Sequence, residues 1–183
     1  MKLHSIVQFV GFETAMSPDD FTAQWERFAK RFFKQDIHTI TLQQQVVTRS
    51  RFKYISRNEW SEDNFQYNFM GSRASDYFPD HRVKVVQTGG YLTIQLENSD
   101  HPDSDIIQVL AFITDEKASI DACRSLPHKY LNIYEAYYQS CQFAFILEFY
   151  VPENESGQLV TDLKKLYHST EVGLYKECLV LEG

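Results

Sequence analysis

The 183-residue sequence predicts an α+β protein that is built from two successive β-α-β-β-α-β units. Strand-like and helix-like patterns follow one another in this order twice, and three segments of the first half return in the same order in the second. IVQFVGF, RFKYI and TIQLE, which begin at 6, 51 and 93, match IIQVLAF, QFAFI and CLVLE, which begin at 106, 142 and 178. We therefore expect an internal duplication with units at 1–98 and 105–183, joined by a polar linker at 99–104.

The first half contains an amphipathic helix whose start is marked by capping residues. Ser17 is a good N-cap, Pro18 suits the first helical position, and the two acids that follow suit the positive end of the helix dipole. Large apolar residues then recur at helical spacing, which predicts a helix over 18–34. Other patterns predict strands at 2–12, 37–47, 51–59 and 91–97, a second helix capped by Ser61, and a turn at Gly89-Gly90.

The second half repeats this order with shorter elements. The apolar run DIIQVLAFIT, which begins at Asp105, predicts a strand, and a short helix is expected around 117–126. Two aromatic-rich strands are expected at 130–138 and 142–151. Leucines and a valine at helical spacing between 159 and 166 predict the last helix, and 172–182 is predicted to be the closing strand.

Composition excludes several classes of function. The net charge is −7, the isoelectric point is near 5.3, and no run of Lys or Arg occurs, which disfavours binding to nucleic acid. No apolar run approaches the roughly 20 residues of a membrane helix, and the N-terminal segment lacks the pattern of a secretory signal. The odd number of cysteines, three, without C-x-x-C spacing is typical of a reduced intracellular protein, so we expect a cytoplasmic location.

A strand–helix step gives a resemblance to a known family. In FKYISRNEWSEDNF, 52–65, a strand ends in Trp60 and an acidic segment follows. The step is similar to that of antibiotic-biosynthesis-monooxygenase-like proteins, and the topology resembles the dimeric α+β barrel superfamily. That resemblance implies two tandem ferredoxin-like units packed sheet to sheet as one pseudo-symmetric barrel. Relatives include cofactor-free monooxygenases, small-ring isomerases, haem enzymes and stress proteins, and a homodimer is one expected state.

In such a barrel one face of each strand contacts the helices and the other lines the interior. Alternation assigns a polar, aromatic-rich face to the interior, and we predict that a ligand is lined by Gln8, Thr41, Lys53, Arg57, Gln108, Tyr134, Tyr138, Tyr150 and Lys176. Glu148 or His4 is the candidate proton acceptor. Gln8 and Gln108 are interpreted as a duplicated pair that faces the interior. The helix-facing set includes Val7, Phe9, Phe52 and Phe143.

The same interior residues allow an alternative without a ligand. Buried charges must be paired, so Lys53, Arg57, Glu148 and Lys176 could form an ion network that fills the barrel, with the two glutamines completing it. Both interpretations stay open from the sequence. A solidly packed interior would favour the network, and a cavity of roughly 300 Å³ or more would favour a binding site.

Other chemistries have little support in the sequence. The six histidines lack metal-binding spacing, and no metal site is expected, although an axial haem ligand is conceivable at His168 or His128. The serine-hydrolase elbow, the P-loop and the dinucleotide-binding fingerprint are all missing from the sequence. FAFI, 143–146, resembles the third strand of an RNA-recognition motif, but the basic residue and glycine that should precede it are absent.

These observations favour an enzyme or binder for a small organic molecule that resembles cofactor-independent monooxygenases. No cofactor, nucleic acid or membrane partner is expected. One alternative is a non-catalytic ligand-binding or oligomeric interaction protein with the same fold, in which exposed aromatic residues form an interface. A second alternative is a haem-binding α+β barrel protein.

Overall fold

The computed structural model describes residues 5–32, 37–47, 50–61, 78, 80–97, 106–127, 131–137 and 139–182. Several predictions lie outside these residues: the helix after Ser61, the linker at 99–104, and the side chains of His4, His128 and Tyr138. The division of the chain into two units with a linker therefore stays a prediction.

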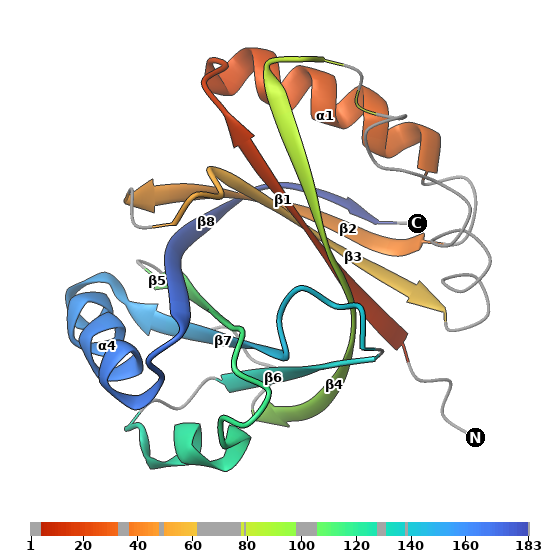
Figure 1. Ribbon diagram of the computed structural model, residues 1–183. Helices are drawn as coiled ribbons and strands as arrows, with labels where there is room; N and C mark the ends of the chain where they lie inside the picture. The colour runs from red at the N-terminus through yellow and green to blue at the C-terminus, as the bar shows by residue number, and fades with distance from the viewer. Residues whose placement is uncertain are drawn as a thin grey trace.

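The described elements follow the predicted order closely (Figure 1). The strands are β1 (Ser5–Thr14), β2 (Ile37–Val47), β3 (Tyr54–Ser61), β4 (Val83–Glu97), β5 (Ile106–Ile113), β6 (Leu131–Ala136), β7 (Phe145–Pro152) and β8 (Thr170–Glu182). The helices are α1 (Pro18–Phe32), the 3₁₀ helix η2 (Ile120–Ser125) and α4 (Glu153–Leu166). The short helix expected around 117–126 is thus a 3₁₀ helix.

The strands close into one antiparallel barrel in the order β1-β3-β2-β8-β5-β7-β6-β4. β4 returns to β1, so the circle is complete, with Val7 opposite Tyr91. The order within the first half, β4-β1-β3-β2, is repeated in the second half as β8-β5-β7-β6, and the halves join where β2 meets β8 and β4 meets β6. The predicted α+β class and the barrel are confirmed.

α1 forms where its capping residues predict and covers one outer side of the barrel (Figure 1). The Ser17 hydroxyl accepts a hydrogen bond from the backbone N–H of Asp20 at 3.3 Å and donates one to its carboxylate at 2.8 Å. Phe21 stacks on Tyr54 with ring centroids 4.0 Å apart. We call this apolar region the α1 layer; its buried members include Ile6, Val10, Phe12, Trp25, Ala29, Ile40, Leu42 and Trp60.

α4 covers the outer side of the second half in the same way. Its apolar side chains pack on strand residues that alternate as predicted, and we call this region the α4 layer. It includes Ile107, Val109, Ile133, Phe145, Leu147, Leu159, Val160 and Leu163. Burial of each such side chain contributes about 1.5–3 kcal/mol relative to exposure. No described helix has the length and apolar character that a membrane span requires.

One end of the barrel interior is filled by three phenylalanines, which we call the aromatic plug. Phe112 lies 5.0 Å from Phe143 and 5.6 Å from Phe52, measured between ring centroids. All three side chains are buried in the interior core, together with Val7 and Phe9. The prediction that Val7, Phe9, Phe52 and Phe143 face the helices is therefore wrong.

Gln8 faces the α1 layer rather than the interior, so its predicted role as a ligand-lining residue is wrong. Its Oε1 accepts hydrogen bonds from Trp60 Nε1 at 3.1 Å and from Asn58 Nδ2 at 3.2 Å. β1 is buried on both faces from Ile6 to Phe12, so alternation of polarity carries no orientation signal there. A shift of one residue reverses every side chain of a strand. Gln8 and Gln108 are not structurally equivalent.

Two local features correct further predictions. Lys53 precedes β3 and lies outside the barrel, where its Nζ donates to the Met16 carbonyl at 3.1 Å. Gly89-Gly90 is not a turn, because β4 runs through both residues. Gly89 has φ of +124°, and a Cβ at this position would lie 2.5 Å from Cys141 Sγ, so glycine is required. The register shift in the β1–β4 pairing lies opposite this site.

Candidate functional site

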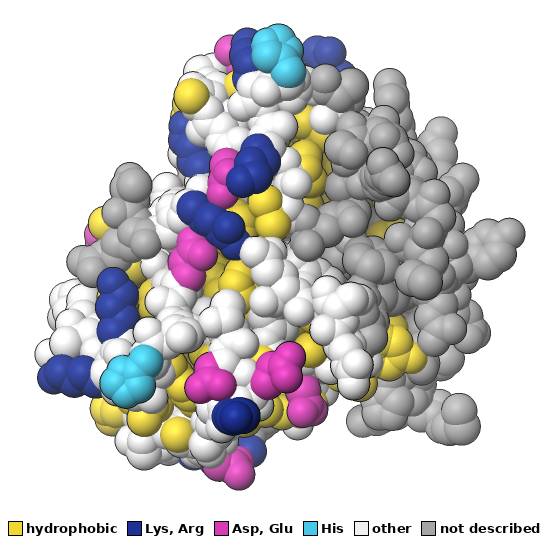
Figure 2. Space-filling view, in the orientation of Figure 1, with side chains coloured by type: hydrophobic (Ala, Val, Ile, Leu, Met, Phe, Trp, Pro, Cys, Tyr) yellow, Lys and Arg dark blue, Asp and Glu magenta, His cyan; other side chains and the backbone are white. Residues whose placement is uncertain are grey.

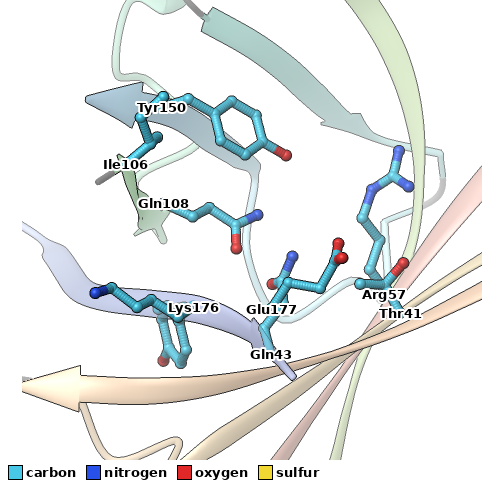
Figure 3. A pocket seen from close by; sticks show the side chains of 9 residues that line it. Thr41, Gln43, Arg57, Ile106, Gln108, Tyr150, Lys176 and Glu177 are labelled. Carbon is cyan, nitrogen blue, oxygen red and sulfur yellow. The ribbon is translucent and has the colours of Figure 1, made fainter. Parts of the chain in front are cut away.

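A cleft of about 470 Å³ occupies the barrel end opposite the aromatic plug. Its volume is in the range of small-molecule sites, which start at roughly 300 Å³. Five strands contribute the residues that line it: Thr41, Gln43, Arg57, Ile106, Gln108, Tyr150, Tyr175, Lys176 and Glu177. Figure 3 shows Gln108, Tyr150 and Arg57 directed toward the space between the strands, whereas the ammonium end of Lys176 lies away from it.

The structure brings most of the predicted site residues of the described chain to this end. Five of them line the cleft, namely Thr41, Arg57, Gln108, Tyr150 and Lys176. Tyr134 and Glu148 are fully buried and join the same cluster from β6 and β7. Gln8 and Lys53 lie elsewhere, and His4 and Tyr138 lie outside the described residues.

Glu148 is the centre of a buried hydrogen-bond network. Its side chain is 1% exposed. Its Oε1 accepts from Asn132 Nδ2 at 2.7 Å, from the Tyr150 hydroxyl at 2.7 Å and from the Tyr134 hydroxyl at 3.4 Å. Its Oε2 accepts from Gln108 Nε2 at 3.0 Å. Only an ionised carboxylate is purely an acceptor, so these four donors suit the charged form of Glu148.

Arg57 supplies a positive charge to the same cluster. Its Nη1 lies 2.6 Å from Glu59 Oε1, and its guanidinium lies 5.7 Å from the ring centroid of Tyr134. Burial acts to lower the pKa of Arg57, but Tyr134 and Glu148 outweigh it and hold the pKa above its ordinary value. Arg57 is therefore a permanent cation beside the cleft.

The interior ion network that the sequence allowed does not form as expected. Arg57 pairs with Glu59, and Lys176 Nζ lies 4.0 Å from Glu153 Oε2 near the surface. Among the described ion pairs none includes Glu148, which is held by neutral donors instead. The charged side chains thus pair with different partners instead of with one another, and they leave the cleft open.

Two buried polar atoms of the cleft residues have no hydrogen-bond partner. They are Gln43 Oε1, an acceptor, and Arg57 Nε, a donor. Gln43 is 3% exposed, so its carbonyl oxygen is withdrawn from bulk water. Thr41 lies directly opposite Arg57 across β2 and β3, and Gln43 is two residues farther along the same face. An unpaired buried polar group costs about 1–3 kcal/mol, so these two atoms lower the stability of this end of the barrel. Trp25 Nε1 and the Tyr54 hydroxyl are unpaired in the same way in the α1 layer.

The tyrosines of this end keep their protons. Burial, followed by the charge of Glu148, raises the pKa of Tyr134 and of Tyr150 well above the ordinary value. Burial likewise raises the pKa of Tyr175, whose hydroxyl donates to the Phe52 carbonyl at 2.9 Å. All three are hydrogen-bond donors at neutral pH.

The predicted site omits four of the residues that line the cleft, Gln43, Ile106, Tyr175 and Glu177. Alternation does place Gln43 on the interior face. It could have found Tyr175 from the apolar residues Val172 and Leu174, which face the α4 layer, but the prediction that Lys176 faces inward put Tyr175 on the opposite face. The ring of Tyr175 lies over Gly173, where a Cβ would not fit. No signal marks Glu177, because Cys178 is skipped in the β2–β8 pairing and the alternation breaks there.

The cleft does not offer the usual ligands of a haem or a metal ion. No described group of His, Cys, Asp and Glu residues could hold a metal ion. The described cleft residues include no His, Cys or Met, and the two tyrosines among them are protonated and donate hydrogen bonds elsewhere. His168 is exposed after the end of α4, away from the cleft residues, so a haem in the cleft does not fit the described side chains.

The surface shows no dominant charge on the face in Figure 2. There the Lys and Arg side chains of the described residues are interspersed with Asp and Glu. Ion pairs of the described residues include Lys84 with Glu13 at 3.0 Å and Arg51 with Glu171 at 3.4 Å. The described part of this face therefore offers no broad basic area.

Several solved structures share this fold, although the sequence matches no protein-family model and no curated protein. An anthrone oxidase-like protein has a TM-score of 0.56 and 11% identity, over 99% of this chain and 94% of that one. A candidate monooxygenase from Fusobacterium nucleatum subsp. nucleatum has a TM-score of 0.55 and 9% identity, over 100% and 96%. A mutant of chlorite dismutase from Candidatus Nitrospira defluvii has a TM-score of 0.56 and 11% identity, over 96% and 92%. The chain thus has the fold of the dimeric α+β barrel superfamily.

Proposed function

We propose that the cleft at the polar end of the barrel binds a small organic molecule that carries both a hydrogen-bond acceptor and a donor. The observation that carries this proposal is the cleft of about 470 Å³, whose walls include the side chains of Arg57 and Gln43. An oxygen of the ligand accepts from the Arg57 guanidinium, and a hydroxyl or amine donates to a Gln43 amide that turns its oxygen toward the cleft. Ile106 and the rings of Tyr150 and Tyr175 supply apolar contact for a planar ring.

The reaction that we propose is oxidation of this molecule by dioxygen without a bound cofactor. One observation supports it, namely the structural neighbours described as an anthrone oxidase-like protein and a candidate monooxygenase. The cleft side chains bind and orient the molecule, and Glu148 lies ready behind them as a proton acceptor. The aromatic plug closes the opposite end, so the reacting molecule has access from the cleft side.

The binding proposal is tested by titrating the purified protein with salicylate and 4-nitrophenol in a calorimeter. Arg57→Met is expected to weaken binding by about tenfold or more, because a hydrogen bond to a charged group contributes about 1.5–3 kcal/mol. Arg124→Met is the matched control, since its side chain is 48% exposed and pairs with Asp121 of η2, outside the residues that line the cleft, and it should change affinity by less than about threefold. Absence of binding to any such molecule, or equal losses in both variants, would contradict the proposal.

The proposed reaction needs a separate measurement. An oxygen electrode should record consumption of dioxygen when a hydroxylated aromatic compound is added to the protein, and the Arg57→Met variant should consume less. Binding without oxygen consumption across a broad panel of compounds would favour the alternative of a non-catalytic ligand-binding protein. A Soret band that appears on addition of haem and is lost in a His168→Ala variant would favour the haem-binding alternative.

A further inference from the structure

We propose that Tyr150 and Glu148 together take the proton from a hydroxyl group of the bound molecule. This role rests on the ligand-binding function proposed above and assigns two residues of this chain to one step. Tyr150 contacts the molecule, and Glu148, behind it, stores the proton. The arrangement requires only side chains whose positions are described.

The geometry makes Tyr150 the route to Glu148. Tyr150 lines the cleft, whereas Glu148 is 1% exposed and is not among the residues that line it. The Tyr150 hydroxyl donates to Glu148 Oε1 at 2.7 Å, which is a short, charge-assisted hydrogen bond. A phenolic oxygen that donates its own proton can still accept a hydrogen bond. A hydroxyl of the ligand can therefore donate to Tyr150 while Tyr150 donates to Glu148.

The step moves two protons and no electrons. The O–H bond of the ligand breaks as a new O–H bond forms on Tyr150, and the original O–H bond of Tyr150 breaks as one forms on Glu148 Oε1. The ligand becomes an oxyanion, Glu148 becomes a neutral acid, and Tyr150 is neutral before and after. No co-reactant is needed. Because Tyr150 never holds a lasting negative charge, the raised pKa of its hydroxyl does not oppose the step.

The Arg57 guanidinium favours the oxyanion that this transfer produces, because Arg57 lines the cleft and brings a positive charge close to the ligand. Asn132 and Gln108 fix the position of the Glu148 side chain by hydrogen bonds of 2.7 and 3.0 Å. These two donors stabilise the ionised carboxylate, so the positive charge of Arg57 beside the oxyanion has to outweigh them. The other titratable groups around the cleft are Tyr134, which donates to Glu148, Glu59, which pairs with Arg57, and the lining residues Tyr175, Lys176 and Glu177.

The inference is tested with 4-nitrophenol, because its anion absorbs visible light and its neutral form does not. The full chain is titrated with the phenol at a pH about one unit below the ionisation of the free compound, and the bound fraction is measured independently by equilibrium dialysis. The wild-type protein is expected to hold mostly the anion. Tyr150→Phe and Glu148→Gln should lower the ratio of anion to neutral phenol in the complex by at least about tenfold, which corresponds to one pKa unit.

The control is Tyr167→Phe, whose hydroxyl donates to the Ser119 carbonyl at 2.9 Å on the α4 side and should leave the ratio unchanged. Circular dichroism shows whether the Glu148→Gln variant folds. If it does not fold, the Tyr150→Phe variant, which keeps the aromatic ring, decides the result. Phenol that binds the wild type in neutral form overturns the inference and leaves the binding function standing. An unchanged ratio in folded variants also overturns it, and absence of binding overturns both proposals.

Discussion

The two ends of the barrel interior are built from the same strands but differ in chemistry. β5 and β7 place Phe112 and Ile146 side by side toward one end and Gln108 and Tyr150 side by side toward the other. At the plugged end the side chains satisfy one another by apolar packing. At the open end a donor and an acceptor are left unpaired. The contrast indicates that one end stabilises the fold, whereas the other stays polar around a cleft at some cost in stability.

The largest expected effect is on stability, at the plugged end. Phe112→Ala should lower the free energy of unfolding by about 3–5 kcal/mol, because it leaves a cavity between Phe52 and Phe143. Urea denaturation measures the loss. Affinity for 4-nitrophenol, measured where the variant is folded, should change little. If a folded Phe112→Ala protein no longer binds 4-nitrophenol, the plugged end contributes to binding as well, and the two ends do not have separate roles.

A slightly smaller loss of stability is expected when Glu148 at the open end is replaced. Unlike Phe112→Ala, this change should also impair function. Glu148→Ala removes the acceptor of four hydrogen bonds and leaves the buried donors of Asn132 and Gln108 unpaired. The free energy of unfolding should fall by about 3 kcal/mol, as for other buried polar groups that lose a charged partner. The same urea titration applies, and ionisation of bound 4-nitrophenol should also disappear. If the Glu148→Ala protein is less stable but bound 4-nitrophenol still ionises, the hydrogen-bond network of Glu148 is structural and has no part in the proposed proton transfer.

A third effect is confined to alkaline solution. Tyr134, Tyr150 and Tyr175 have raised pKa values in the folded protein, compared with 10.0 when unperturbed. The folded state therefore binds more protons than the unfolded state above pH 10, so stability is full below pH 10 and falls as the pH rises beyond it. Urea midpoints between pH 8 and 11 measure this slope, which should be shallower in Tyr150→Phe. Equal slopes in the two proteins would show that Tyr150 ionises freely while folded.

The smallest expected effect has the opposite sign. Gln43→Leu removes the unpaired buried acceptor and should raise the free energy of unfolding by about 1 kcal/mol while weakening ligand binding severalfold. Gln45→Leu is the matched control two residues away, because Gln45 bonds to Ser50 and Phe52 through hydrogen bonds of 2.8–2.9 Å. It should destabilise the protein. Destabilisation by Gln43→Leu would mean that Gln43 is satisfied in solution.

Much of the second half of the barrel was predictable from residue alternation. β5, β6 and β7 place apolar residues in the α4 layer, and the polar residues Gln108, Tyr134, Glu148 and Tyr150 lie inward, where the pattern puts them. Phe112 and Ile146 also lie inward although they are apolar, and Phe143, just before β7, was assigned to the wrong side. Each of these strands keeps a regular register with at least one neighbour. Alternation is reliable in such strands because only one register buries the apolar side chains against the helix and directs the polar side chains inward.

The first half defeated the same reasoning for identifiable physical reasons. β1 is apolar on both faces, so a lone Gln8 does not reveal the direction in which it points. Phe52 and Lys53 precede β3, and the alternation of β3 cannot be extended to them. The bulges beside Gly89 and Cys178 each shift by one residue the alternation of side chains that face inward and outward, and the local sequence does not mark either bulge strongly. The cleft depends on pairing across β2 and β8, which are distant in sequence, so its unpaired atoms could not be predicted.

Closure of the barrel by a single chain has a consequence for how a molecule can lie within it. A barrel made of two identical chains would present every wall residue twice, related by a two-fold axis, and would accept a guest in two equivalent orientations. Here Arg57 on β3 has Tyr150 of β7 as a different neighbour across the cleft. A molecule in this cleft would therefore meet unlike walls, and its two orientations would differ in energy.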